Sequence, residues 1–398
     1  MAIRPKAAML KRIAVVTGYA IREKLPNGRN PVRAIDEVPA TPESVTTAWL
    51  TAALCRSHPA ARVEHFELGR GSDGTSNRRA IRVGYNEAGD AARLPVFLWT
   101  KMTATLRTRL ITGLANMGAG EARFYNLVRP HVDFGSPAGF HAAFDPRSLR
   151  SISVMEDVGL TRNATFGSTL EPVSRLEAES MVAQMAAYHG AFWDSPRLTG
   201  DLAELPTAED FLLNMAQMIN FERQSLRGLH RCREFVPDSI VRRSAELWPG
   251  LIKSMALQRS LPRTVIHQDT HAGNWFRYGT NKMALTDWQG VARGSWATDL
   301  SYALSANLRP EDRRLWESDL LKKYLDHLAE AGGARLGFDE AFLAYRREML
   351  HGLFFWLFPG AGSRFQPSYQ PHAEVVNHIH RTAQAAEDLD TLGAIAAS

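Results

Sequence analysis

The sequence predicts an α+β protein in which a small sheet-rich part comes first and a larger helical part follows. Its 398 residues, 45% of them hydrophobic, are enough for two domains or one large two-lobed domain with sizeable cores. From Ser174 onward, apolar residues recur mainly at helical spacing. Earlier in the chain, apolar residues alternate as in β-strands, over residues 62–68, 79–85, 94–100 and 151–155.

We expect three parts: a basic N-terminal extension over residues 1–40, a sheet-rich lobe over 41–158 and a helical lobe over 159–398. The extension carries several Lys and Arg residues before the short apolar run Ile13 to Val16. That run is too short for a signal peptide, and no small-residue cleavage site follows it. The prediction is an extension packed on the body, and contact with a membrane surface or a partner is the alternative.

Composition narrows the class of protein. Lys and Arg exceed Asp and Glu by five, a mild excess that suits anionic ligands such as nucleotides without indicating nucleic-acid binding. Cys55 and Cys232 lie far apart and lack metal-ligand spacing, which favours a reducing compartment and hence the cytoplasm. No apolar run approaches the ~20 residues of a membrane span. The oligomeric state does not follow from these features.

The stretch from Val265 to Asp287 carries the clearest chemical pattern. Asp269 is followed five residues later by Asn274, and Asp287 comes thirteen residues after that, which is the H-x-D-x-x-x-x-N then Asp arrangement of a phosphoryl-transfer loop. Apolar runs on both sides predict flanking strands. Asp269 suits the carboxylate that orients a hydroxyl and accepts its proton, and Asn274 and Asp287 offer the oxygen ligands that Mg²⁺ prefers.

Two further residues are predicted to support this loop. His267 is expected to brace it by a hydrogen bond, and Asp299 is expected to hold it by accepting backbone N–H groups unless it is only a helix-start carboxylate. A competing interpretation takes His267, Asp269 and His271 as an H-x-D-x-H zinc site of a metallohydrolase. That alternative is disfavoured because no second His or Cys cluster supplies ligands and Asn274 goes unexplained.

A glycine-rich turn lies between the first two predicted strands. Gly69, Gly71 and Gly74 spell G-x-G-x-x-G, a string that also opens dinucleotide-binding helices. Here a strand follows the glycines, which favours a loop that covers the phosphates of ATP. A plain hairpin turn is the alternative.

Other candidate nucleotide-binding residues follow in the order that a kinase lobe needs. Lys101 ends the third strand, and Glu121 lies on an otherwise apolar helical face, so we expect an ion pair between them. The alternatives are an edge lysine and a glutamate at a helix start. Met155 and Glu156, where a strand meets a linker, are candidates to bind adenine through exposed backbone groups, unless this is an ordinary strand end.

The stretches HQDTHAGN and LTDWQGVARGSWATDLSY resemble the aminoglycoside and choline phosphotransferase superfamily over roughly Val63 to Leu304. The DWQ variant, EARFY and VMEDVG are most similar to its ecdysteroid-kinase-like (CHK-type) branch. The resemblance implies a protein-kinase-like bilobal fold, ATP or GTP with Mg²⁺, and phosphorylation of a hydroxyl on a small molecule. Gln268 departs from the family, which usually has Gly there.

The helix-rich C-terminal part gives one indication of the acceptor. Phe354, Phe355 and Trp356 lie in the run LFFWLF and are candidates to line a substrate pocket, unless they belong to the core. An aromatic pocket favours a sterol-like or lipid-like alcohol over an aminoglycoside or choline-type substrate. A pseudokinase scaffold that only binds a nucleotide is the non-enzymatic alternative, and the intact loop argues against it.

Overall fold

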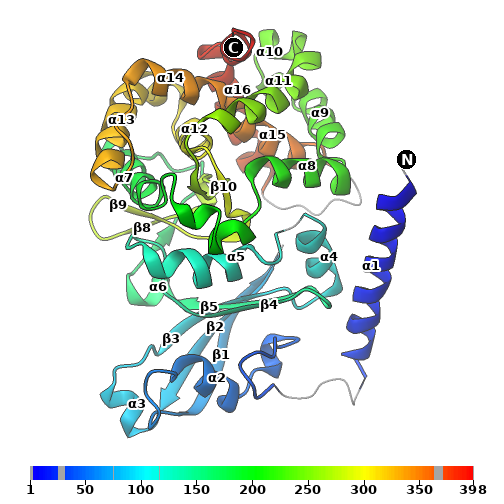
Figure 1. The fold of residues 1–398 in the computed structure, drawn as a ribbon, viewed down its shortest axis with the longest axis vertical. Helices are drawn as coiled ribbons and strands as arrows, with labels where there is room; N and C mark the ends of the chain where they lie inside the picture. Colours follow the sequence, from blue (N-terminus) through cyan, green and yellow to red (C-terminus); the bar gives the residue numbers. More distant parts are fainter. Residues whose placement is uncertain (1–2, 26–31, 75, 116, 363–370, 398) are drawn as a thin grey trace. The chain divides into compact units, whose positions relative to one another are not determined.

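The computed structural model describes residues 3–25, 32–74, 76–115, 117–362 and 371–397. The chain divides into two compact units (Figure 1). Unit 1 comprises Met1–Pro130 and Pro137–Thr161, and unit 2 comprises His131–Ser136 and Arg162–Ser398. Unit 1 contains an antiparallel sheet and unit 2 is mainly helical, so the predicted α+β class, with a sheet-rich lobe and a larger helical lobe, is confirmed.

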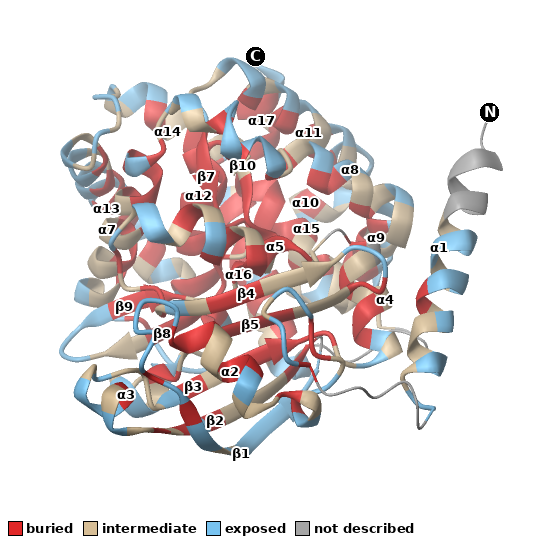
Figure 2. Cartoon of the chain, turned by 60° about the horizontal axis from the view of Figure 1, so that its bottom comes forward, coloured by how far each residue is buried: buried red, intermediate tan, exposed pale blue. Residues whose placement is uncertain are grey.

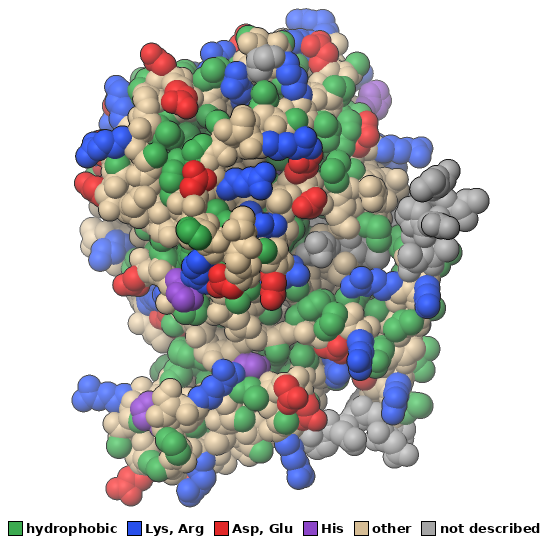
Figure 3. Space-filling view, in the orientation of Figure 1, with side chains coloured by type: hydrophobic (Ala, Val, Ile, Leu, Met, Phe, Trp, Pro, Cys, Tyr) green, Lys and Arg blue, Asp and Glu red, His purple; other side chains and the backbone are tan. Residues whose placement is uncertain are grey.

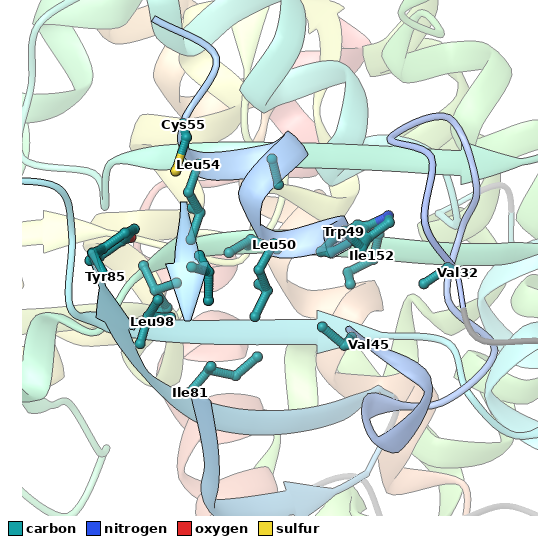
Figure 4. Close-up of a cluster of buried hydrophobic side chains, with 14 of the residues drawn as sticks. Val32, Val45, Trp49, Leu50, Leu54, Cys55, Ile81, Tyr85, Leu98 and Ile152 are labelled. Atoms are coloured by element: carbon teal, nitrogen blue, oxygen red, sulfur yellow. The ribbon is translucent and has the colours of Figure 1, made fainter. Parts of the chain in front are cut away.

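The sheet of unit 1 has five strands in the order β1-β2-β3-β5-β4, and all neighbouring strands are antiparallel. The strands are β1 Val63–Asp73, β2 Asn77–Tyr85, β3 Phe97–Met102, β4 Gly139–Asp145 and β5 Arg150–Glu156. Helix α2, Thr47–Leu54, starts at the cap residue Thr46, whose side chain accepts the Trp49 N–H. The helix packs on the sheet, where Trp49 and Leu50 join Ile81, Leu98 and Ile152 in a buried core (Figure 4).

The glycine-rich hairpin differs from the prediction. Strand β1 continues through Gly69 and Gly71, with a bulge between Leu68 and Gly71, so most of the predicted turn is strand. A Cβ on Gly71 would lie 2.2 Å from the Arg78 carbonyl oxygen, a clash that only glycine avoids. Of the three glycines, only Gly74 lies in the turn.

The N-terminal segment forms α1, Ile3–Arg22, which packs against α4, Leu106–Leu114. Val16 in the middle of α1 is fully buried. Just after the helix, Glu23 accepts two hydrogen bonds from the Arg109 guanidinium, at 3.0 and 2.5 Å. Because Arg109 is itself fully buried, this ion pair anchors the end of α1 on unit 1. Short helices complete the unit: α3 Glu87–Ala91, α5 Gly120–Arg123 with a π-helical continuation Phe124–Val128, and α6 Val158–Thr161.

Unit 2 is built around a fully buried helix, α12, Trp296–Asn307 (Figure 2). Helix α7, Arg175–Ala191, packs against α12 and begins with a capping box, in which Ser174 and Glu177 exchange hydrogen bonds. The other helices are α8 Ala208–Ile219, α9 Phe221–Arg231, α10 Asp238–Arg242, α11 Ser244–Leu257, α13 Pro310–Glu330, α14 Phe338–Arg347, α15 Met349–Gly360, α16 His372–Asp388 and α17 Thr391–Ala396.

Short strands flank the predicted catalytic stretch, as the apolar runs indicated. Strand β7, Thr264–Ile266, precedes it and pairs with β10, Ala292–Gly294. Strands β8, Trp275–Tyr278, and β9, Lys282–Leu285, form the hairpin that leads to Asp287. A two-residue strand, β6 Thr165–Phe166, extends that hairpin. The structure therefore presents the stretch between ordered strands.

None of the helices among the described residues is long and apolar enough to cross a membrane. Cys55 and Cys232 are both buried free thiols.

Candidate active site

Asp299 on α12 anchors the backbone of the predicted catalytic loop. Its two carboxylate oxygens accept the N–H groups of His267 and Gln268, each at 2.7 Å. Tyr188 donates its hydroxyl to the same carboxylate at 2.7 Å, and His189 lies 3.3 Å away through Nε2. A fully buried side chain thus accepts the backbone N–H groups directly before Asp269.

The electrostatics of Asp299 follow from these contacts. Burial alone raises the pKa of the carboxyl, but the hydrogen bonds from the His189 side chain and the His267 N–H hold the pKa below its usual value. The carboxylate is therefore charged at neutral pH. His189 is also paired through its other ring nitrogen, Nδ1, which lies 2.8 Å from the Tyr324 hydroxyl.

The His267 ring forms hydrogen bonds with two backbone groups. Its Nδ1 accepts the Asp269 N–H at 3.1 Å, so the neutral ring carries its proton on Nε2, which lies 2.9 Å from the Thr286 carbonyl oxygen. Burial lowers the pKa of this imidazole, which keeps it neutral. One ring thus connects the loop at Asp269 to the residue directly before Asp287.

The zinc interpretation of His267, Asp269 and His271 is wrong. Both ring nitrogens of His267 are used in hydrogen bonds to the backbone, so neither is available as a ligand. His271 also uses Nδ1, to accept the Gly273 N–H at 3.1 Å. Across the part of the chain that the structure describes, no group of three or more His, Cys, Asp or Glu side chains could hold a metal ion.

The carboxylate of Asp269 is held from three sides and keeps about a fifth of its side chain exposed. Asn274 Nδ2 lies 3.2 Å from Oδ2, the Tyr302 hydroxyl lies 3.4 Å from Oδ1, and His271 Nε2 lies 3.7 Å from Oδ2. Burial, and then the charge of Asp269, raise the pKa of Tyr302 well above its usual value, so its hydroxyl stays protonated. Sequence reasoning missed Tyr302, although it follows Asp299 by three residues and so lies one helical turn further on.

The β8–β9 hairpin brings Asn274 and Asp287 together. Trp275 pairs with Leu285, and the Thr286 N–H donates to the Asn274 carbonyl oxygen at 2.9 Å. Asp287 then adopts a left-handed backbone, with φ 65°, at the start of a 3₁₀ turn. Such a conformation is uncommon for a non-glycine residue and occurs often at functional positions.

The donor set at this point fits Mg²⁺. The Nδ2 of Asn274 donates to the Asp269 main-chain oxygen at 2.8 Å, which leaves the amide oxygen available to bind a cation. An amide oxygen and the carboxylate of Asp287 are the hard oxygen ligands that Mg²⁺ prefers, and phosphate oxygens and water usually complete such a set.

Gln268, the departure from the family pattern, also has a left-handed backbone, with φ 67°. Glycine adopts this conformation without strain, which accounts for the family preference. Here the buried Gln268 side chain donates to the Gly290 carbonyl oxygen at 2.7 Å, and its own carbonyl oxygen lies 2.8 Å from His351 Nε2. These hydrogen bonds offset the strain and tie the loop to the 3₁₀ turn after Asp287 and to α15.

In unit 1 the predicted ion pair between Lys101 and Glu121 is present, with Nζ 3.2 Å from Oε1. Lys101 lies near the end of β3, which has β2 on one side and β5 on the other. Glu121 lies on the short helix α5, and both side chains are about nine-tenths buried. A buried pair of this kind holds the lysine side chain in one orientation.

Met155 and Glu156 end strand β5, and the hydrogen bonds there correct part of the expectation that exposed backbone groups bind adenine. The N–H groups of Glu156 and Asp157 already donate to the carbonyl oxygens of Ala138 and Phe97, at 2.9 and 3.2 Å. The Glu156 carboxylate accepts the Ala138 N–H at 3.1 Å and the Thr161 hydroxyl at 2.6 Å. These two N–H groups are therefore not free to bind adenine.

The three aromatic candidates on α15 face different neighbours. Phe354 is fully buried against Phe221 and Trp248, as a core residue is. Trp356 is also buried, and it stacks on His378 at 3.7 Å between ring centroids and meets His271 edge-on at 5.1 Å. Phe355 is partly exposed.

Phe355 stacks on His351, with ring centroids 4.4 Å apart, and contacts Tyr302 at 6.2 Å. Since Tyr302 in turn contacts Asp269, Phe355 is a partly exposed residue of the run that lies near the loop.

Residues 85–342 match the family described as the phosphotransferase enzyme family. The chain belongs to this family. The match covers more than half of the 398 residues and includes the whole stretch from Val265 to Asp287. No curated protein matches the chain.

Solved structures similar to this phosphotransferase share little sequence with it. An ethanolamine kinase from Plasmodium vivax is 9% identical, with 90% of this chain and 91% of that chain covered and a TM-score of 0.48. A macrolide 2'-phosphotransferase from Brachybacterium faecium is 13% identical, with coverage of 83% and 95% and a TM-score of 0.43. A choline kinase from Streptococcus pneumoniae is 12% identical, with coverage of 82% and 94% and a TM-score of 0.43. The family assignment rests on the sequence match.

Proposed function

We propose that this phosphotransferase uses ATP to phosphorylate a hydroxyl group of a small, largely apolar alcohol, such as a sterol-like or lipid-like compound. The observation that carries the proposal is the loop, in which Asp269 and Asn274 are hydrogen-bonded to each other and tied to the segment before Asp287. A protein that only bound nucleotide would have no need for this set. We include GTP as an alternative donor, a cytoplasmic location and membership of the ecdysteroid-kinase-like branch as parts of the proposal.

In this proposal each residue has one task. Asp269 orients the acceptor hydroxyl and accepts its proton as the phosphoryl group transfers. Asn274 and Asp287 would hold Mg²⁺, which would neutralise charge on the phosphates. Lys101, oriented by Glu121, would bind the phosphates of the nucleotide.

The remaining predicted nucleotide contacts involve mainly backbone groups, which are less specific than the side chains named above. Backbone N–H groups near Gly69, Gly71 and Gly74 would lie over the phosphates. At Met155 and Glu156, adenine would contact the carbonyl oxygen or the side chain, because the N–H group of Glu156 is already bonded within unit 1.

The side chains around Asp269 support the apolar acceptor. Those in contact with it or with its neighbours include Tyr302, Phe355 and His271, which present rings rather than carboxylates. A polycationic aminoglycoside would require acidic groups for recognition, and a choline-type amine would favour an aromatic cage. Choline-type acceptors are therefore the second candidate class, ahead of aminoglycosides.

Binding of Mg²⁺ with ATP gives the first test. We expect saturating ATP to raise the melting temperature of the full chain and Mg²⁺ to increase that shift, since a ligand at about 100 times its Kd stabilises by about 2.7 kcal/mol. Asp287→Asn should retain the shift with ATP alone and lose the increment from Mg²⁺. Differential scanning fluorimetry measures both effects.

The matched control is Asp326→Asn, which removes an exposed carboxylate on α13. It should behave as the wild type. A wild-type shift with ATP that Mg²⁺ does not change would favour the nucleotide-binding scaffold instead.

A further inference from the structure

Helix α1 has two different faces. One face packs on unit 1, where Val16 is fully buried and Glu23, just beyond the helix, is bonded to Arg109. On the other face, large apolar side chains are open to solvent: Leu10 is 63% exposed and Ile21 is 59% exposed. Val15 and Leu25 are also exposed. Single exposed hydrophobic side chains are common on protein surfaces, but several close together on one helix indicate an interaction surface.

The exposed apolar residues form a stripe along the helix. Leu10, Ala14, Gly18 and Ile21 follow one another at intervals of four, four and three residues, and all four are exposed. This spacing places them on one side of an α-helix.

Basic side chains border the stripe. Lys11 and Arg22 each directly follow a residue of the stripe and lie beside it, and Arg12 and Lys24 are also exposed. From Met9 to Leu25 the sequence holds a single acidic residue, Glu23, which is used in the ion pair with Arg109. Figure 3 shows hydrophobic and Lys or Arg side chains on the part of α1 that follows the grey residues. We call the stripe of Leu10, Ala14, Gly18 and Ile21, together with the exposed basic residues near it, the basic-apolar face.

The charge of this face decides between possible partners. A second copy of the chain would bring the same basic residues against each other in a two-fold interface, which is unfavourable. An acidic groove in another protein would pair with the charges, but it would also have to match the convex surface of a single helix. A lipid interface adapts to that surface and requires no such match. There, phosphate groups meet Lys and Arg while Leu and Ile enter the acyl boundary.

We propose that the basic-apolar face of α1 docks the protein peripherally on an anionic membrane surface. The helix lies in the plane of the interface, and its buried face and the ion pair between Glu23 and Arg109 keep it attached to unit 1. This proposal does not depend on the proposed enzymatic function.

Vesicle binding tests this proposal. The full chain is sedimented with phosphatidylcholine vesicles that either contain or lack phosphatidylglycerol. We expect binding only to the anionic vesicles, and weaker binding as salt rises towards ~0.15 M. The double variant K11Q/R22Q should bind about thirtyfold more weakly, since each basic residue near an anionic surface contributes about fivefold.

A second variant, L10S/I21S, tests the apolar component without changing charge, and it should also lose most binding. The matched controls lie elsewhere on the surface: Leu315→Ser on α13, which removes a 74% exposed leucine, and Lys282→Gln on β9. Circular dichroism establishes that all variants are folded. Absent binding by the wild type, or α1 variants that bind as well as the controls, would overturn the proposal. A change in oligomeric mass of the α1 variants without vesicle binding would also overturn it, in favour of self-association.

Discussion

Replacing Asp269 by Asn is expected to lower kcat for phosphoryl transfer by about a thousandfold, because a positioned general base contributes about 10²–10⁴-fold. The amide has nearly the same shape as the carboxylate but cannot accept the proton of the acceptor hydroxyl. The KM for ATP should change little, since Asp269 is not among the residues proposed to hold Mg²⁺ or phosphate. Steady-state kinetics with a phosphorylated alcohol as the measured product checks both expectations.

Tyr302→Phe is an informative companion to Asp269→Asn. It removes the hydroxyl that lies 3.4 Å from the Asp269 carboxylate and keeps the buried ring, so we expect a smaller loss of kcat. If Asp269→Asn retained wild-type kcat, Asp269 could not be the general base.

Replacing Asp299 by Ala should have the largest effect on stability, about 3–5 kcal/mol, which is the usual cost of removing one partner from a buried charged network. The substitution leaves the N–H groups of His267 and Gln268 and the Tyr188 hydroxyl without their acceptor in the core. Urea-induced unfolding, followed by tryptophan fluorescence, measures the effect as a lower midpoint. Asp326→Ala, on the surface of α13, is the control and should leave the midpoint nearly unchanged.

The same carboxylate predicts a dependence of stability on pH. The pKa of Asp299 is lower in the folded protein than the ordinary value of about 3.9. Its contribution to the free energy of unfolding is therefore complete at a pH above that ordinary value. The contribution is lost as the pH falls from about 4 through the lower folded pKa. The difference in unfolding free energy between wild type and Asp299→Ala should therefore be constant from neutral pH to about 5 and shrink below about 4. A difference that grew with acidity would contradict the assignment of Asp299 as a charged anchor.

The loop could be predicted from the sequence because its chemistry depends on local spacing. Asp269, Asn274 and the two short strands are set by residues close together in the chain, and the braces from His267 and Asp299 follow from the same pattern. Tyr302 was missed, since its contact with Asp269 depends on how α12 packs rather than on a motif. The same holds for Gln268, whose left-handed backbone is evident only from the structure.

The predictions that the structure corrects failed for a reason similar to the one that hid Tyr302. The glycines after Leu68 suggested a turn, but a strand with a bulge accommodates Gly71, where the absence of a side chain allows close approach to the next strand. At Glu156 the sequence could not show that backbone N–H groups already pair with residues far along the chain. Phe354 and Phe355 are adjacent and chemically identical, and only helix packing puts one in the core and leaves the other partly exposed.

Detection of the phosphorylated product is the most direct test of the proposed reaction. The purified chain is incubated with ATP, Mg²⁺ and a library of hydroxyl compounds that includes sterol-like and lipid-like alcohols, choline-type amines and aminoglycosides, and products are identified by mass spectrometry. We predict a phosphate monoester of an apolar alcohol that forms only with ATP and Mg²⁺ present and does not form with Asp269→Asn. Phosphorylation of aminoglycosides alone would contradict the apolar acceptor, and consumption of no ATP with any compound would contradict the proposed phosphotransfer itself.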